Sequence, residues 1–362
     1  MRRGTAAGKR RPPQAAGARF RGRGAGRLAT ILVALAFAAT GCQAGYVVKQ
    51  GWRHFTLLSR SASIEAGGGE KVEERAAMLA WVPRILDFAE KNLALDPGDS
   101  YRTYLDTGGA PVSWIVTASH RLALIPYQWS FPFVGMVPYK GFFDEEDAHS
   151  EAKRLRAEGY EAAVFPVAAF STLGWFRDPV TSPMLEGDLA DLADNLIHET
   201  THRTVYFPGM ASFNESLATH MAREGTTRFL AAHPELAGLL PGYTAGCEAA
   251  RERETLLLRA RNDLDALYRS ALGAEEKERR KREVFDTASA ALRRLTGGKG
   301  GVSPSNAWVL ALARYHEHEP LLEMLQASLG GEPSRVIAYL KELPESADPV
   351  EAILRTLAGE RT

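Results

Sequence analysis

The segment DLADLADNLIHETTHRTVYF, residues 188–207, carries two superimposed patterns from which the rest of the chain can be understood. The first pattern is that of a helix. Asp188 is a preferred N-cap residue, and apolar side chains then recur at three- and four-residue steps, which is the spacing of one helix face. These apolar residues are Leu189, Leu192, Ala193, Leu196 and Ile197. The spacing predicts a helix that begins near Asp188 and packs this face against a core.

The second pattern is HExxH, formed by His198, Glu199 and His202. Residues four apart share one helix face, so both imidazoles can bind the same metal ion. Glu199 lies about 100° further round the helix, where its carboxylate can take a proton from the attacking water. HExxH arises by chance in roughly 1–2% of chains with this histidine content, but here it falls inside a capped helix. The pattern therefore favours a catalytic zinc site.

A catalytic zinc site takes a third protein ligand and leaves one position open to water. The turn sequence Phe207–Met210 allows a second helix to fold back on the first, which brings Glu215 near the two histidines. Two alternatives remain. Ser212 and Glu215 have the spacing of a capping box, so Glu215 could instead satisfy the backbone at the helix start. Glu224 is the other candidate carboxylate, about 180° round the same helix from Glu215, so only one of the two can face the metal. We favour Glu215 as the ligand.

The first 41 residues differ from the rest of the chain in charge. They hold nine basic residues and no acidic ones, and an uncharged run from Leu28 to Thr40 ends this stretch. That run is shorter than the roughly 20 residues that cross a bilayer, so the pattern predicts a secretory signal peptide. It ends at Ala39-Thr40-Gly41-Cys42, which resembles a bacterial lipobox. We expect residues 1–41 to be removed and residues 42–362 to form the mature body.

In a lipobox the cysteine is acylated, so we expect a lipid on Cys42 to anchor the mature chain to a membrane. The alternative is an ordinary cleaved signal followed by a chance cysteine. Gln43, in place of an aspartate, favours the outer membrane by analogy with bacterial sorting rules. The predicted location is therefore an exported lipoprotein that faces the periplasm.

The composition of the mature body excludes other classes of protein. It carries 35 basic against 44 acidic residues, a balance that disfavours nucleic-acid binding. The two cysteines, Cys42 and Cys247, provide neither a disulfide framework nor a cysteine-based zinc cluster. The sequence indicates no particular oligomeric state.

The organisation of the mature body predicts an α+β fold, with a small β-sheet and a mainly helical second half. Residues 70–232 hold the sheet and the active-site helices, and residues 233–362 form a helical C-terminal region. The expected helices cover Glu70–Leu95, Asp144–Glu158, Glu248–Leu272 and Glu275–Leu295, followed by two or three more. The expected strands cover Ser113–Ala118, Leu122–Ile125, Val134–Tyr139 and Ala162–Phe170. Gly159 is the expected C-cap of the second helix, and Gly273 separates the last two as a hairpin.

HExxH followed on the next helix by Asn214, Glu215 and Ala218 resembles the gluzincin metallopeptidases. More narrowly, nearly the whole mature chain resembles a family of bacterial lipoproteins described as predicted zinc aminopeptidases. The stretches that carry this resemblance are Gly41-Cys42, Phe131–Phe143, Ser171–Phe176, His198–His202, Phe213–Ala218 and, more weakly, Asn306-Ala307, Tyr315 and Pro320.

The resemblance implies a zincin-like catalytic region with one Zn²⁺ per chain, held by His198, His202 and Glu215. It implies Glu199 as the general base and a peptide as the substrate. The family commonly has a small apolar pair at the position of Thr200-Thr201, neither of which is a ligand.

Several residues have candidate roles beside the metal. Val134–Tyr139, with Val137 and Tyr139, could be an edge strand that pairs with the substrate backbone, or could be core packing alone. Trp175, in a Gly-Trp-Phe loop, could form a pocket wall or only anchor its own loop. Tyr206 or Tyr315 could donate a hydrogen bond to the developing oxyanion.

Two polar groups have both a functional and a structural interpretation. Asp191, Asp194 and Asn195 precede His198 on roughly its face of the helix and could orient a ligand, but we favour a solvated helix start. His316–Glu319 (HEHE) resembles a metal site in composition. Its histidines are two apart and point to different helix faces, so we favour a polar helix end.

Together these features predict a lipid-anchored, zinc-dependent peptidase, with aminopeptidase as the activity that the resemblance implies. The sequence identifies no anchor for the free ammonium of a substrate, so a zinc endopeptidase or a cell-wall amide hydrolase is the alternative among enzymes. The alternative from another class is a non-enzymatic, lipid-anchored protein whose long helices bind a partner.

Overall fold

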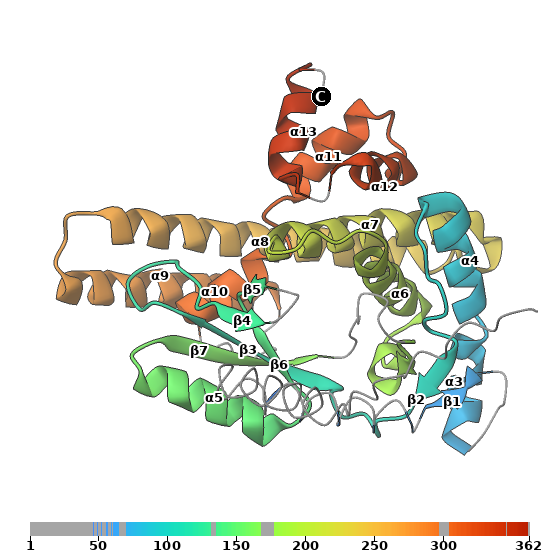
Figure 1. Ribbon diagram of the computed structural model, residues 1–362, viewed down its shortest axis with the longest axis horizontal. Coiled ribbons are helices and arrows are strands. Elements are labelled where there is room, and N and C mark those ends of the chain that lie inside the picture. The colour runs from blue at the N-terminus through green and yellow to red at the C-terminus, as the bar shows by residue number, and fades with distance from the viewer. Residues whose placement is uncertain are drawn as a thin grey trace, which may run out of the picture. The chain divides into compact units, whose positions relative to one another are not determined.

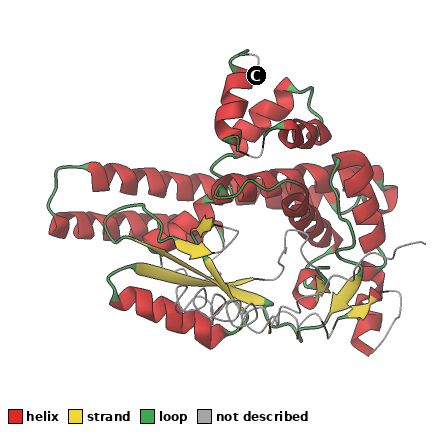
Figure 2. Cartoon of the chain, viewed as in Figure 1, coloured by secondary structure: helices red, strands yellow, loops and turns green. Residues whose placement is uncertain are grey.

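The computed structural model describes residues 61–64, 70–131, 135–167, 177–296, 304–344 and 346–360, with residues 46, 49, 52, 56 and 59 singly. Contacts divide the chain into Met1–Lys49 and Gln50–Thr362, and everything below concerns the second unit. Its helices and small sheets confirm the α+β class (Figure 2). The predicted signal peptide, Cys42 and Trp175 lie outside the described residues. Within the described residues, no helix has the length and apolar character needed to cross a bilayer.

The first helical stretch is divided in two, so the prediction of one continuous helix over Glu70–Leu95 was wrong. Helix α3 covers Glu70–Leu79 and α4 covers Val82–Leu93. Pro83 lies in the first turn of α4, where its missing N–H needs no partner, and this explains why a new helix starts there. Ala94, in the left-handed conformation with φ 58°, ends α4.

The described strands form three small sheets. Strands β6 (Lys140–Phe142), β3 (Ser113–Ser119) and β7 (Glu161–Val167) are antiparallel in that order. Strand β2 (Thr103–Leu105) pairs with β1 (Ala62–Ser63) and β8 (Val180–Thr181), while β4 (Trp129–Phe131) and β5 (Gly135–Val137) form a hairpin. In β7, Pro166 is tolerated because no further described strand pairs with the outer edge of β7.

Two strand predictions need correction. Leu122–Ile125 is not a strand, because the chain turns there and returns only to a single bridge between Ser119 and Pro126. The expected strand Val134–Tyr139 is interrupted after Val137, and the chain enters a different sheet at Lys140.

Helices cover both faces of the sheet β6-β3-β7. In Figure 1, α5 (Glu145–Ala157) lies below it and α10 (Asn306–Ala313) above it. The side chain of Asp144 caps α5 by accepting a hydrogen bond from the backbone N–H of Asp147, and Gly159 follows the helix with φ 90°. The prediction of this helix is confirmed, but its C-cap is Glu158, and Gly159 is the next residue, in the left-handed conformation.

The second half of the chain is helical, as predicted. Its helices are α6 (Leu189–Thr204), α7 (Ala211–Ala232), α8 (Leu240–Arg269), α9 (Ala274–Leu295), α10, α11 (Glu319–Ser328), α12 (Pro333–Glu342) and α13 (Pro349–Leu357). Helices α8 and α9 form the predicted hairpin, with Gly273 at the N-cap of α9. The described residues after 304 form four helices instead of two or three, because Pro320, Pro333 and Pro349 each start a new one.

The largest core packs α4, α6 and α7 against the C-terminal helices. Gly225 permits the close approach of α7 to its neighbours. A Cβ atom at Gly225 would lie 2.6 Å from Cδ1 of Leu93 and 3.1 Å from Cδ1 of Ile197. Because Ile197 is adjacent to His198, this packing positions the histidines of α6 next to α7.

Candidate metal centre and its cleft

Helix α6 begins at a capping box and presents the two histidines one turn apart. The side chain of Asp188 accepts hydrogen bonds from the N–H groups of Ala190 and Asp191, at 2.8 and 3.1 Å. The Asp191 side chain in turn accepts one from the N–H of Asp188, at 3.0 Å. Between the histidines, the buried hydroxyls of Thr200 and Thr201 donate to carbonyls one turn earlier, so this polar pair is satisfied within the helix.

The turn between α6 and α7 is held by Asn214. Its side-chain amide donates to the carbonyl of Phe207 at 2.8 Å and accepts from the N–H of Phe207 at 3.0 Å. Gly209 in the same turn has φ 79°, a conformation that favours glycine. Both bonds are buried, so Asn214 defines how α7 leaves α6 and hence where its neighbour Glu215 points. In the sequence, Asn214 stands out only as part of the Asn-Glu-x-x-Ala motif.

The structure brings His198, His202 and Glu215 together. The Nε2 atoms of the two histidines are 3.2 Å apart. Oε2 of Glu215 lies 3.5 Å from Nε2 of His198 and 3.4 Å from Nε2 of His202. The three side chains are 11–17% exposed, so the group is largely buried but open on one side.

This triangle fits a zinc ion. Ligand atoms about 2.0–2.1 Å from a tetrahedral zinc lie roughly 3.3 Å from one another, close to the three distances observed. Two imidazole nitrogens and a carboxylate oxygen are also a usual donor set of catalytic zinc sites. The described residues that could hold this ion are therefore His198, His202 and Glu215.

The charges of the centre favour a cation. Burial raises the pKa of Glu215, but the two histidines lower it much further, so the carboxyl stays ionised. Burial lowers the pKa of His198, but Glu215 and Glu199 raise it more, so positive charge is favoured at this position. Burial raises the pKa of Glu199, with only partial compensation by the histidines, which makes its carboxylate a stronger base.

A cleft of about 390 Å³ opens beside the histidines. Helix α6, strands β3 and β7 and the end of α10 line it. The lining residues are Ile115, Thr117, Phe165, Pro166, Val167, Asp194, Asn195, His198, Glu199, Ala311, Leu312, Arg314 and Tyr315. On the sheet side the described walls come from β3 and β7. Val137 is not among these lining residues: it is buried and pairs with Trp129 in the β4–β5 hairpin.

Three tyrosines surround Glu215. The ring of Tyr315 lies 6.2 Å from that of His198, between centroids. The charge of Glu215, followed by burial, raises the pKa of Tyr315. Burial, followed by the same charge, raises the pKa of Tyr139 and Tyr206. All three hydroxyls therefore keep their protons and can act as hydrogen-bond donors.

The alternatives for the third carboxylate are resolved by geometry. Ser212 does not cap α7: its hydroxyl donates to Oε2 of Glu317 at 2.6 Å, and the N-cap position is Met210. Glu224 accepts hydrogen bonds from Arg228 and Gln326 instead of facing the histidines. Glu215 is the carboxylate at the centre.

The preference for a solvated helix start holds for Asp191, which belongs to the capping box, but is wrong for Asp194. The carboxylate of Asp194 lines the cleft and accepts a hydrogen bond from the hydroxyl of Tyr243 on α8. Burial raises its pKa, while Tyr243 and His198 lower it. Its position four residues before His198 was the available signal, but its partner is 49 residues away.

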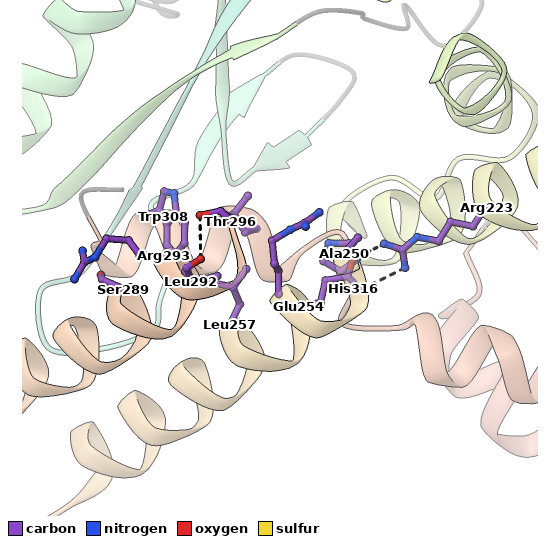
Figure 3. A pocket seen from close by; sticks show the side chains of 12 residues that line it. Arg223, Ala250, Glu254, Leu257, Ser289, Leu292, Arg293, Thr296, Trp308 and His316 are labelled. Atoms are coloured by element: carbon purple, nitrogen blue, oxygen red, sulfur yellow. Dashed lines mark hydrogen bonds and ion pairs between the residues drawn. The ribbon is translucent and has the colours of Figure 1, made fainter. Parts of the chain in front are cut away.

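The expected polar helix end at His316–Glu319 is confirmed, since the segment lies between the end of α10 and the start of α11, but His316 and Glu319 also join a buried ion-pair network. Nδ1 of His316 lies 3.3 Å from Oε1 of Glu254 and 3.4 Å from Oε2 of Glu319. Arg223 bridges the two carboxylates, with Nη1 at 2.7 Å from Oε1 of Glu319 and Nη2 bonded to Glu254. Figure 3 shows Arg223, Glu254 and His316 at one pocket. Because a guanidinium already pairs with both carboxylates, this group is an internal ion-pair network.

Comparison with known proteins identifies the family. The family model described as "Putative aminopeptidase" matches residues 45–352, which is most of the chain. No curated protein and no solved structure matches this chain. The family's description indicates peptidase activity and hence a peptide substrate. The chain belongs to this "Putative aminopeptidase" family.

Proposed function

We propose that the protein is a zinc-dependent aminopeptidase whose zinc ligands are His198, His202 and Glu215. The observation that carries this proposal is the triangle of donor atoms, with sides of 3.2, 3.4 and 3.5 Å. When bound, zinc supplies a Lewis acid for the scissile carbonyl and lowers the pKa of the attacking water. Family membership supports the peptidase part of the proposal independently.

Glu199 is the proposed general base. It follows His198 directly on α6, lines the cleft and lies close enough to both histidines for their charges to lower its pKa. Its carboxylate accepts the proton of the attacking water and then delivers it to the leaving amine. Its raised pKa suits the first step, because a stronger base accepts the proton of the water more readily.

Tyr315 is the proposed donor to the oxygen of the scissile carbonyl as negative charge develops on it. Its ring lies beside that of His198, and its hydroxyl remains protonated. Hydrogen-bond donors aimed at a developing oxyanion stabilise the transition state more than the ground state. Tyr206, also near Glu215, is the second candidate for this role.

The proposed location rests on the sequence of residues 1–43. Cys42 carries the lipid, and the catalytic body faces the periplasm, with the outer membrane favoured. Metabolic labelling with radioactive palmitate tests this directly. The wild-type protein should incorporate label and Cys42→Ser should not, whereas equal labelling of the two would contradict the anchor.

The enzymatic proposal is tested with alanine 4-nitroanilide and its N-acetylated form. An aminopeptidase cleaves the free amine and not the blocked one, whereas equal cleavage would indicate the endopeptidase alternative. Glu199→Gln should retain the metal and lose about 10²–10⁴-fold in kcat. No cleavage of either substrate by the wild type, no stoichiometric metal, and a cellular phenotype that Glu199→Gln leaves intact would favour the non-enzymatic binding protein.

A further inference from the structure

Arg314 places a buried cation in the cleft beside the candidate metal centre. It is the C-cap residue of α10, is only 7% exposed and lines the cleft together with Glu199 and Tyr315. Its guanidinium carbon lies 5.0 Å from the ring centroid of Tyr139. The positive group is therefore held against an aromatic face, with its free side toward the cleft.

Within the described part of the chain, the guanidinium of Arg314 makes neither an ion pair nor a hydrogen bond, although Glu199 lines the same cleft and the charge of Glu215 reaches the neighbouring Tyr139. Other largely buried cations behave differently: Arg223 pairs with two glutamates, and Lys281 pairs with Glu161. Buried charges are normally paired, so the exception calls for a partner that enters from outside.

The backbone of Arg314 explains how the residue is held without using its side chain. Its carbonyl accepts a hydrogen bond from the hydroxyl of Ser216 at 3.1 Å, and the hydroxyl of Ser212, which donates to Glu317, lies 3.4 Å away. Both serines belong to α7, and Ser216 directly follows Glu215. The residue is thus fixed relative to the metal centre, while its guanidinium is left for a ligand.

We propose that Arg314 binds a carboxylate of the peptide substrate, close to the scissile bond. This inference rests on the proposed function and adds a substrate preference to it. A guanidinium matches a carboxylate with two parallel hydrogen bonds, and a partly dry cleft strengthens that pairing. Arg314 is adjacent to Tyr315, which contacts His198, so the bound carboxylate lies within a short peptide's length of the reacting carbonyl.

Such a carboxylate has two sources, the carboxyl end of a short peptide or an acidic side chain. Calorimetric titration of the purified Glu199→Gln protein, which is expected to bind without turnover, separates them. The three probes are Ala-Ala, Ala-Ala-amide and Ala-Glu-amide. Tighter binding of Ala-Ala alone assigns the terminal carboxylate, and tighter binding of Ala-Glu-amide assigns the side chain. We expect at least one of them to bind about tenfold or more tightly than Ala-Ala-amide.

Arg314→Met in the same background should abolish that preference, and Arg314→Lys should retain part of it. Arg251→Met is the matched control, because Arg251 is exposed and pairs with Glu323 away from the cleft. Circular dichroism melts of all variants show that the fold persists. Equal binding of all three peptides, no binding of any, or a preference that survives in Arg314→Met would overturn the inference.

Turnover provides a second, independent measurement. In the active protein, Arg314→Met should raise KM for the preferred peptide and leave KM for Ala-Ala-amide nearly unchanged. An equal fall of kcat for both would mean that Arg314 serves the scissile carbonyl, which overturns the proposal. If the protein proves to contain no zinc but binds the carboxylate through Arg314, the proposed function fails, while the carboxylate site at Arg314 stands.

Discussion

The side-chain amide of Asn214 binds both the N–H and the carbonyl of Phe207, seven residues earlier, and so joins the start of α7 to the end of α6. The two helices carry all three candidate metal ligands. A single side-chain amide thus helps to fix the position of Glu215, at the start of α7, relative to His202, near the end of α6.

Replacing Asn214 by alanine should therefore weaken both the fold and the metal centre. Two buried backbone groups of Phe207 lose their partner, which costs about 2–4 kcal/mol in the free energy of unfolding. The affinity for zinc should also fall at least about tenfold. Urea unfolding and competition with a zinc chelator measure the two effects. Asn92→Ala, an exposed change on α4, is the control, and an equal loss in both variants would contradict this role.

Tyr243→Phe should weaken zinc binding by about tenfold without a comparable loss of stability. The hydroxyl of Tyr243 donates to Asp194, and the charge of Asp194 helps to raise the pKa of His198. Without this donor the pKa of Asp194 rises further, so Asp194 carries less negative charge to attract a cation at His198. Tyr339→Phe, which loses only a hydrogen bond with Thr356, is the matched control. Unchanged chelator competition in Tyr243→Phe would show that Asp194 does not position the ligand.

Arg223→Met should destabilise the fold by about 3–5 kcal/mol, because it leaves the carboxylates of Glu254 and Glu319 buried without their shared cation. Both glutamate side chains are at most 10% exposed, so water cannot replace the guanidinium effectively. Equilibrium unfolding in urea measures the loss. The exposed pair of Arg251 gives the comparison, since Arg251→Met should cost less than about 1 kcal/mol. Similar losses in the two variants would refute the network.

Acid should weaken the same network. Burial raises the pKa of Glu319, but His316 and Arg223 lower it more, so its folded pKa lies below the ordinary 4.5. A group with a depressed folded pKa contributes stability above its unfolded pKa and loses it as the pH falls through the folded value. Between about pH 5 and pH 3 the wild type should therefore lose more stability than Glu319→Gln. Parallel pH profiles of the unfolding free energy would contradict this.

Local patterns predicted much of the catalytic half. The cap at Asp188, the HExxH spacing and the Phe207–Met210 turn together placed Glu215 beside the histidines, because each depends on residues that are near in sequence. The hairpin of α8 and α9 was predicted for the same reason. The start of a new helix at α4 could also have been predicted from the sequence, because Pro83 lies in its first turn.

The remaining features depend on contacts between distant segments. Asp194 meets Tyr243 from another helix, and Arg223 meets two glutamates from α8 and α11. No periodicity or motif relates these positions, because the packing of α7 against α8 and α11 brings them together. Arg314 is the clearest example: its significance lies in the absence of an ion-pair partner among the described residues, which only a folded structure reveals.

The most direct test of the central proposal is the metal content of the purified protein, measured by mass spectrometry together with that of Glu215→Ala and Glu224→Ala. We expect about one zinc per chain in the wild type and in Glu224→Ala, and a large loss in Glu215→Ala. A wild type without stoichiometric zinc, or a Glu215→Ala variant that keeps it, would contradict the proposed zinc site.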